Sequence, residues 1–154
     1  MLLNGISDLY VLKMILLRKH TVMEFNDDIL HVFVIDDDEF LLTGVKRSLE
    51  DAGYKVTTSN NVHDAYFKLN LLKPDLILLD VIMPDINGIE FMALLNSEFP
   101  LSDIPVILMS YLAKEELQKM GHTVNNMNFI PKPFNFHSLS SKLKRMRTSL
   151  AQTE

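Results

Sequence analysis

The stretch DLILLDVIMPDINGIEF, residues 75–91, decides the fold of this 154-residue chain. Residues 76–79 form a continuous apolar run without polar alternation, which is typical of a parallel strand covered on both faces. The run ends at Asp80, and the turn-forming residues 84–88 follow it. The next apolar residues recur at helical spacing and are Ile89, Met92, Leu95 and Phe99. A buried strand followed by a turn and a helix predicts one unit of an α/β fold.

The same pattern recurs on both sides of this stretch. Short apolar runs predict strands at residues 31–35 and 106–109. Residues 55–59 are a further, shorter strand candidate, and residues 128–130 give a weak fifth strand. Residues at helical spacing predict four more helices, whose stripes are Leu42, Val45, Leu49 and Ala52; Val62, Ala65, Tyr66, Leu69 and Leu72; Ala113, Leu117 and Met120; and Leu139, Leu143, Met146 and Leu150. Gly53 and Pro74 are expected to end the first two of these helices. Five strands interleaved with five helices predict an α/β protein with a doubly wound, five-stranded parallel sheet.

The composition excludes several classes of function. With 47% hydrophobic and 23% charged residues, the chain reads as one soluble globular domain. The absence of cysteine excludes disulfides, thiolate metal sites and cysteine nucleophiles. A formal net charge of -5 argues against a nucleic-acid-binding surface, so we expect no direct contact with nucleic acid. These features predict a cytoplasmic protein.

Residues 1–28 precede the alternating pattern. The apolar residues 11–17 are too few for a membrane span and include Lys13, so no span is expected. Positive charges follow this stretch instead of preceding it, unlike a secretory signal. One helical face carries Leu2, Ile6, Leu9, Lys13 and Leu16. We therefore expect an N-terminal extension at 1–28, either disordered or a docking helix, followed by a domain at 29–150 and a tail at 151–154.

Polar residues stand at the carboxyl ends of four predicted strands, and they are Asp36, Asp37, Asp80, Ser110 and Lys132. Open parallel α/β sheets bind ligands outside the carboxyl ends of their strands. Three carboxylates gathered there repel one another, and a hard divalent ion such as Mg²⁺ relieves the repulsion. Lys132 and Ser110 would then supply a positive charge and a hydroxyl donor to phosphoryl oxygens. The set indicates a carboxylate that becomes covalently phosphorylated.

The chain resembles the receiver domains of bacterial response regulators. The resemblance covers about residues 30–150 and lies in the segments VFVIDDDEF at 32–40, DLILLDVIMPDINGIEF at 75–91, PVILMS at 105–110 and IPKPF at 130–134. The intervals also match, with 43 positions from Asp37 to Asp80, 30 to Ser110 and 22 more to Lys132. The resemblance implies a flavodoxin-like receiver fold with strand order 2-1-3-4-5.

The resemblance also implies a role for each site residue. Asp80 would accept the phosphoryl group from a histidine kinase or a histidine phosphotransfer protein in a two-component or phosphorelay system. Asp36, Asp37 and Asp80, with the backbone carbonyl of Ile82, would hold Mg²⁺. Such a domain catalyses only its own phosphoryl transfer and dephosphorylation, so it is not an enzyme acting on other substrates. The downstream protein target is not implied.

Further roles follow from the same resemblance. Ser110 and Phe129 would form the switch that responds to phosphorylation. Lys132 would assist the transfer, and its bond to Pro133 is commonly cis in such domains. Gly88 matches the glycine after the phosphorylation loop. The chain departs from the family at two positions, which are Tyr111, where a small residue is usual, and Asn125, where glycine is common.

Two other functions fit part of the pattern. A haloacid-dehalogenase-type phosphatase opens with Asp-x-Asp, which Asp36 and Asp38 would satisfy. That class also needs an acidic pair after the lysine, and only Glu154 follows Lys132. The second alternative is a receiver-like binding module that works without phosphorylation, against which the intact aspartates and Lys132 argue. Asp38 taken alone would also make an ordinary helix N-cap.

Overall fold

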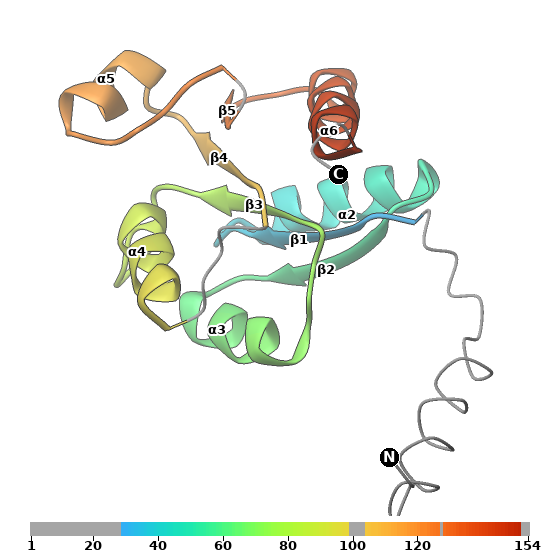
Figure 1. Ribbon diagram of the computed structural model, residues 1–154, viewed down its shortest axis with the longest axis horizontal. Coiled ribbons are helices and arrows are strands. Elements are labelled where there is room, and N and C mark those ends of the chain that lie inside the picture. The colour runs from blue at the N-terminus through green and yellow to red at the C-terminus, as the bar shows by residue number, and fades with distance from the viewer. Residues whose placement is uncertain (1–28, 99–103, 127, 152–154) are drawn as a thin grey trace, which may run out of the picture.

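A computed structural model describes residues 29–98, 104–126 and 128–151 of the chain. Its strands form one parallel sheet in the order β2-β1-β3-β4-β5, flanked by helices (Figure 1). The strands are β1 His31–Ile35, β2 Lys55–Ser59, β3 Leu76–Asp80, β4 Val106–Ser110 and β5 Phe129–Pro131. The helices are α2 Glu39–Asp51, α3 Val62–Leu71, α4 Gly88–Glu98, α5 Lys114–Lys119 and α6 Phe136–Ala151. The predicted fold class and strand order are confirmed.

Some of the predictions for the two ends of the chain concern residues outside the described ranges. The predicted extension at 1–28 and residues 152–154 of the predicted tail lie outside the described residues. Helix α6 ends at Ala151, one residue beyond the predicted domain boundary. No helix in the described part of the chain is both long and apolar enough to cross a membrane.

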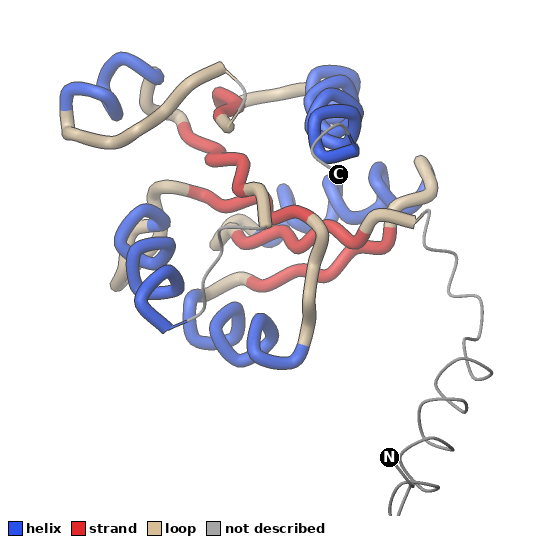
Figure 2. The backbone as a smooth tube through the Cα atoms, in the orientation of Figure 1, coloured by secondary structure: helices blue, strands red, loops and turns tan. Residues whose placement is uncertain are grey.

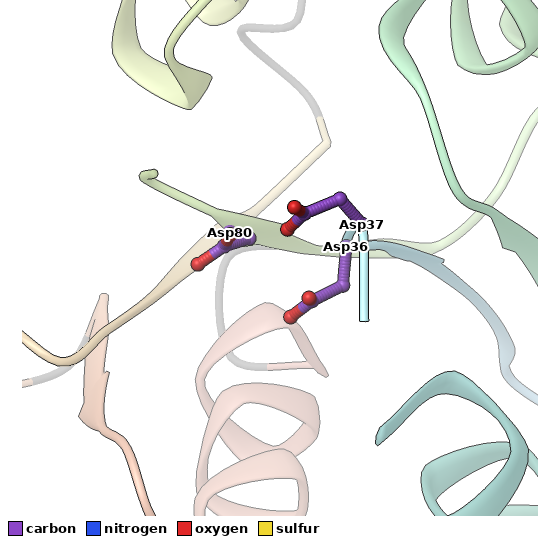
Figure 3. Close-up of side chains that lie close together, drawn as sticks. All are labelled: Asp36, Asp37 and Asp80. Carbon is purple, nitrogen blue, oxygen red and sulfur yellow. The ribbon is translucent and has the colours of Figure 1, made fainter. Parts of the chain in front are cut away.

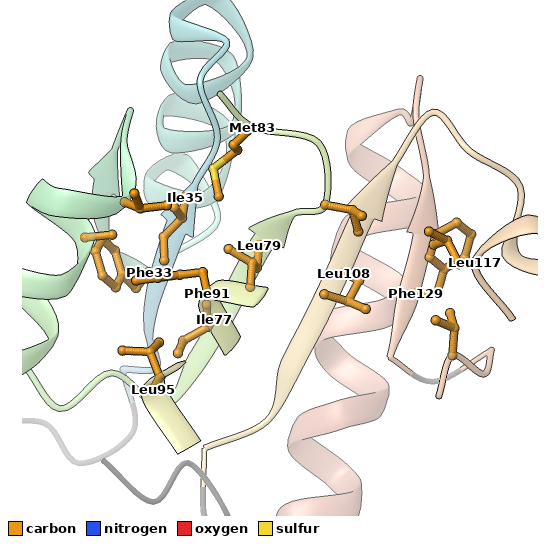
Figure 4. Packing of buried hydrophobic residues seen from close by; sticks show 14 residues of the cluster. Phe33, Ile35, Ile77, Leu79, Met83, Phe91, Leu95, Leu108, Leu117 and Phe129 are labelled. Atoms are coloured by element: carbon orange, nitrogen blue, oxygen red, sulfur yellow. The ribbon is translucent and has the colours of Figure 1, made fainter. Parts of the chain in front are cut away.

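Helices cover both faces of the sheet, and successive side chains of each strand point to opposite faces. The sheet therefore has a hydrophobic core on each side. Phe33 and Ile35 of β1 pack in a core with residues of α3, α4 and α5 (Figure 4). Val32 and Val34, which alternate with them, pack in a second core with residues of α2 and α6. Figure 2 shows the helices on both sides of the strands. This burial explains why residues 32–35 of β1 and 76–79 of β3 are apolar throughout.

Helix α2 begins and ends at residues whose local chemistry suits a helix end. The Asp38 carboxylate accepts hydrogen bonds from the backbone N–H groups of Phe40 at 2.9 Å and Leu41 at 3.1 Å. Gly53 follows the helix with φ of +88°, a conformation that favours glycine. The predicted stripe is buried at Leu42, Val45 and Leu49. Ala52 instead caps the helix and is exposed, so the last member of the predicted stripe was wrong.

The region around α5 departs furthest from the predicted pattern. Of the predicted stripe only Leu117 is buried, whereas Ala113 and Met120 cap the six-residue helix and Met120 is 62% exposed. The following segment is irregular but pinned, because Gln118 Nε2 donates to the backbone oxygen of Val124 at 2.7 Å. Val124 is buried in the same core as Leu117. The packing of Val124 therefore holds the segment between α5 and β5 against the core, and α5 does not continue into this segment.

Gly88 provides a test of how tightly the loop after β3 is packed. Its backbone N–H donates to the Val81 oxygen at 2.8 Å, and a Cβ on Gly88 would overlap the backbone carbonyl oxygen of Asp80. We expect Gly88→Ala to lower the free energy of unfolding by about 1–3 kcal/mol, because the end of β3 must move. Gly44→Ala is the matched control, since a Cβ there meets nothing within 4 Å. That change in an exposed stretch of α2 should raise the free energy of unfolding by about 0.5–1 kcal/mol. Urea unfolding measures both, and equal stabilities of the two variants would contradict the packing described.

Candidate functional site

Three carboxylates meet at the carboxyl ends of β1 and β3. Asp36 and Asp37 directly follow β1, and Asp80 is the last residue of β3. Because β1 and β3 are parallel neighbours, one oxygen of each side chain lies within 4.8 Å of the others (Figure 3). Asp36 and Asp80 are buried, whereas Asp37 is exposed and forms the solvent side of the cluster. The predicted acidic site is thus assembled by the sheet topology.

Lys132 directly follows β5, and its side chain extends into this cluster. Its Nζ lies 2.5 Å from Oδ2 of Asp36 and 3.0 Å from Oδ1 of Asp80. Its backbone N–H donates to the Ser110 oxygen at 2.7 Å, which fixes the end of β5 to the end of β4. Oδ1 of Asp36 also accepts from the backbone N–H of Asp38 at 2.9 Å. The Lys132–Pro133 peptide bond is cis, as the resemblance implies.

The ionisation of these groups reflects burial first and pairing second. Burial raises the pKa of Asp80 to about 6, and the hydrogen bond from Lys132 opposes this rise without cancelling it. Burial also raises the pKa of Asp36, again against the effect of Lys132. Burial acts to lower the pKa of Lys132, but its hydrogen bonds to Asp36 and Asp80 and the negative charges of these aspartates together outweigh burial, so the pKa is raised. One ammonium is therefore paired with the two buried carboxyl groups of the cluster, while Asp37 is exposed.

The donor set fits a hard divalent cation. All three side chains offer carboxylate oxygens close enough to share one ion, and oxygen is the ligand that Mg²⁺ prefers. Burial is the main cause of the two raised aspartate pKa values, and repulsion from Asp36 and Asp37 adds to that of Asp80, so a cation would relieve part of the rise. Ile82, predicted to add its backbone carbonyl, lies in the loop after β3 with a side chain that is 51% exposed. Its role as a ligand stays a prediction.

The two predicted switch residues are both buried but lie at different distances from the carboxyl edge of the sheet. Ser110 ends β4 at the same edge of the sheet as Asp80, is fully buried, and accepts a hydrogen bond on its Oγ from the Leu112 N–H at 3.0 Å. Phe129 begins β5 and pairs in register with Leu108, two residues before Ser110. Its side chain is 7% exposed and lies in the core that α5 covers. Phe129 therefore sits beneath the site and not in it.

One contact at the site was not predicted. The Tyr111 ring centroid lies 5.4 Å from Nζ of Lys132, and Tyr111 is 66% exposed. The sequence marks Tyr111 as unusually large for its position but carries no signal that its ring faces the lysine. Asp38, which the phosphatase alternative requires in the site, caps α2 instead.

Comparison with known proteins agrees with this geometry. The family model described as "Response regulator receiver domain" matches residues 32–144. The transcriptional regulatory protein CrdR of Helicobacter pylori is 32% identical over 114 residues, which cover 74% of this chain and 53% of that protein. The phosphate regulon transcriptional regulatory protein PhoB of Pseudomonas aeruginosa is 32% identical over 113 residues, covering 73% and 49%. The chain thus spans about half the length of these curated relatives.

Solved structures show the same fold. The chemotaxis response regulator CheY4 of Vibrio cholerae is 28% identical with a TM-score of 0.68, covering 76% of this chain and 98% of that one. The response regulator TrrA of Thermotoga maritima, solved in complex with Mg²⁺ and BeF, is 26% identical with a TM-score of 0.63 and the same coverage. The family model spans most of the chain and includes every residue of the acidic site. The phosphatase alternative is therefore set aside, and the chain belongs to the family of response regulator receiver domains.

Proposed function

We propose that this receiver domain accepts a phosphoryl group on Asp80 from a phosphohistidine of a histidine kinase or histidine phosphotransfer protein. The observation that carries the proposal is the position of the Asp80 carboxylate, which is buried in an acidic cluster and 3.0 Å from the Lys132 ammonium. Mg²⁺ would be held by Asp36, Asp37 and Asp80, and when bound it would neutralise charge on the cluster and on the phosphoryl oxygens.

The transfer is a displacement at phosphorus. A bond forms between an Asp80 carboxylate oxygen and phosphorus, while the bond from phosphorus to the donor's histidine nitrogen breaks and its electron pair returns to the imidazole. Lys132 holds the Asp80 carboxylate in place before transfer through its contact with Oδ1. As negative charge moves onto the phosphoryl oxygens, the ammonium can follow it at short range.

Ser110 and Phe129 form the proposed switch. The Ser110 hydroxyl is at the same sheet edge as Asp80 and can donate a hydrogen bond to a phosphoryl oxygen. Any shift of Ser110 is transmitted to β5, because β4 and β5 are paired and the Ser110 oxygen accepts from the Lys132 N–H. Phosphorylation would thus bias an equilibrium between two arrangements of β5 and α5, the surface that a downstream protein would read.

We place this function in the cytoplasm, in a two-component or phosphorelay pathway. The relatives CrdR and PhoB are transcriptional regulatory proteins about twice as long as the matched region. The acidic balance of this chain, with a net charge of -5, supports signalling through protein contacts and not through direct binding of nucleic acid.

The phosphoacceptor is tested by one substitution and a matched control. The Asp80→Asn variant should take up no phosphoryl group from acetyl phosphate and Mg²⁺, because it lacks the nucleophilic carboxylate. Asp85→Asn makes the same chemical change at an exposed residue with φ of 70°, a conformation that asparagine tolerates, and should be phosphorylated normally. Intact mass spectrometry reads both. Phosphate on another residue of the wild type would refute the assignment, and a wild type that takes none would favour the binding-module alternative.

The raised pKa of Asp80 predicts a pH-dependent cost in stability. In the metal-free protein this pKa rises from 3.8 to about 6, so the folded state holds a proton that the unfolded chain releases. The stability from that proton is fully present below pH 3.8 and is lost as the pH rises through about 6. With a chelator at about pH 7.5, Asp80→Asn should therefore exceed the wild type in free energy of unfolding by about 1–3 kcal/mol. The difference should shrink at about pH 5, and urea unfolding at both pH values measures it. A difference that does not change with pH would show that the buried charge is not its cause.

A further inference from the structure

Tyr111 gives the Lys132 ammonium an aromatic partner in addition to its two carboxylates. The residue directly follows β4, and its ring centroid is 5.4 Å from Nζ of Lys132. A cation within about 6 Å of a ring centroid is attracted to the electron-rich face of the ring. The Lys132 side chain is 3% exposed, so its ammonium has little water to offset the loss of any partner. The ammonium is buried and the ring is 66% exposed, so the contact lies at the boundary between the site and solvent.

The three partners of Lys132 behave differently when a phosphoryl group arrives. An Asp80 carboxylate oxygen becomes bonded to phosphorus, and the negative charge that the ammonium faced moves to the phosphoryl oxygens. A bound cation would attract the Asp36 carboxylate, which would then no longer pair with Lys132 alone. The Tyr111 ring takes no part in the bonds that form and break. It is the partner that stays the same on both sides of the reaction.

We propose that Tyr111 is a positioning residue, whose ring holds the Lys132 ammonium where it meets the transferring phosphoryl group. The inference rests on the proposed function of Asp80, because Lys132 acts there. The ring face and not the phenol hydroxyl makes the contact, so phenylalanine should replace Tyr111 and leucine should not. A ring that only obstructed the donor would have the opposite effect, since its removal would speed the reaction.

The test compares the rate of phosphorylation by acetyl phosphate and Mg²⁺ in three proteins, followed by intact mass over a range of donor concentrations. Tyr111→Phe should stay within about twofold of the wild type, because the aromatic face is kept. Tyr111→Leu should lower the limiting rate by about threefold to thirtyfold, with the half-saturating donor concentration unchanged. Phe67→Leu is the control, because Phe67 on α3 is similarly exposed at 64% and lies outside the acid site. It should react as the wild type does.

Two results would overturn the role of Tyr111 while leaving Asp80 as phosphoacceptor. One is a Tyr111→Leu variant that reacts as fast as Tyr111→Phe or faster than the wild type. The other is a Tyr111→Phe variant as slow as Tyr111→Leu, which would assign the effect to the hydroxyl. A wild type that takes no phosphoryl group refutes the proposed function itself, and this role falls with it.

A second measurement examines the contact without any phosphodonor. Melting temperatures of Tyr111→Leu, Lys132→Met and the double variant form a double-mutant cycle. If the ring and the ammonium attract each other, the two single changes should not add, because either one alone removes the contact. Strictly additive changes would show that no attraction exists and would overturn the inference. Tyr111 is 66% exposed, so the leucine variant is expected to fold.

Discussion

The buried pairing of Lys132 with Asp36 and Asp80 is the interaction on which the rest of this site depends. It ties the ends of β1, β3 and β5 together across the sheet, with Nζ at 2.5 Å and 3.0 Å from the two carboxylates. Buried charges persist only when paired, yet one ammonium cannot balance three carboxyl groups. Burial raises the pKa of Asp80 to about 6, the neighbouring aspartates add to the rise, and a bound cation would relieve that repulsion. The parallel sheet brings several strand ends to one edge, and this arrangement produces both the buried pairing of Lys132 and the acidic cluster.

Much of the fold could be predicted because the inner strands β1, β3 and β4 are buried on both faces. A continuous apolar run marks such a strand directly, and the bounds of β1 agree with the predicted ones. The bounds of the edge strand β2 agree as well, although its sequence is mostly polar. Helix ends were harder, because an apolar stripe can continue past the last helical residue. Met120 shows this, since it has the right spacing but caps α5 and is exposed. The turn at Gly121, with φ of +89°, ends that helix, and hydrophobic periodicity carries no information about it.

The site residues could be predicted for a different reason, namely that topology alone places the ends of neighbouring parallel strands together. The sequence offered Asp36 and Asp37 as metal ligands and Asp38 as a helix N-cap, but it could not tell which aspartate is buried and which is exposed. Asp36 is buried against Lys132, Asp37 faces solvent in the acidic cluster, and Asp38 caps α2. The residue at which β1 ends decides which of the three aspartates takes which role, and a shift of one residue would change the assignment. The contact between Tyr111 and Lys132 depends on side-chain direction and has no sequence signal.

The most direct test is a crystal structure of the protein with Mg²⁺ and beryllofluoride, an analogue of the phosphoryl group. We expect the beryllium to be bonded to an Asp80 carboxylate oxygen, with Mg²⁺ ligated by Asp36, Asp37 and Asp80 and by the Ile82 carbonyl. The Lys132 ammonium should contact a fluorine. Beryllofluoride on any other residue, or a metal ion away from the three aspartates, would contradict the proposal that this cluster exists to phosphorylate Asp80.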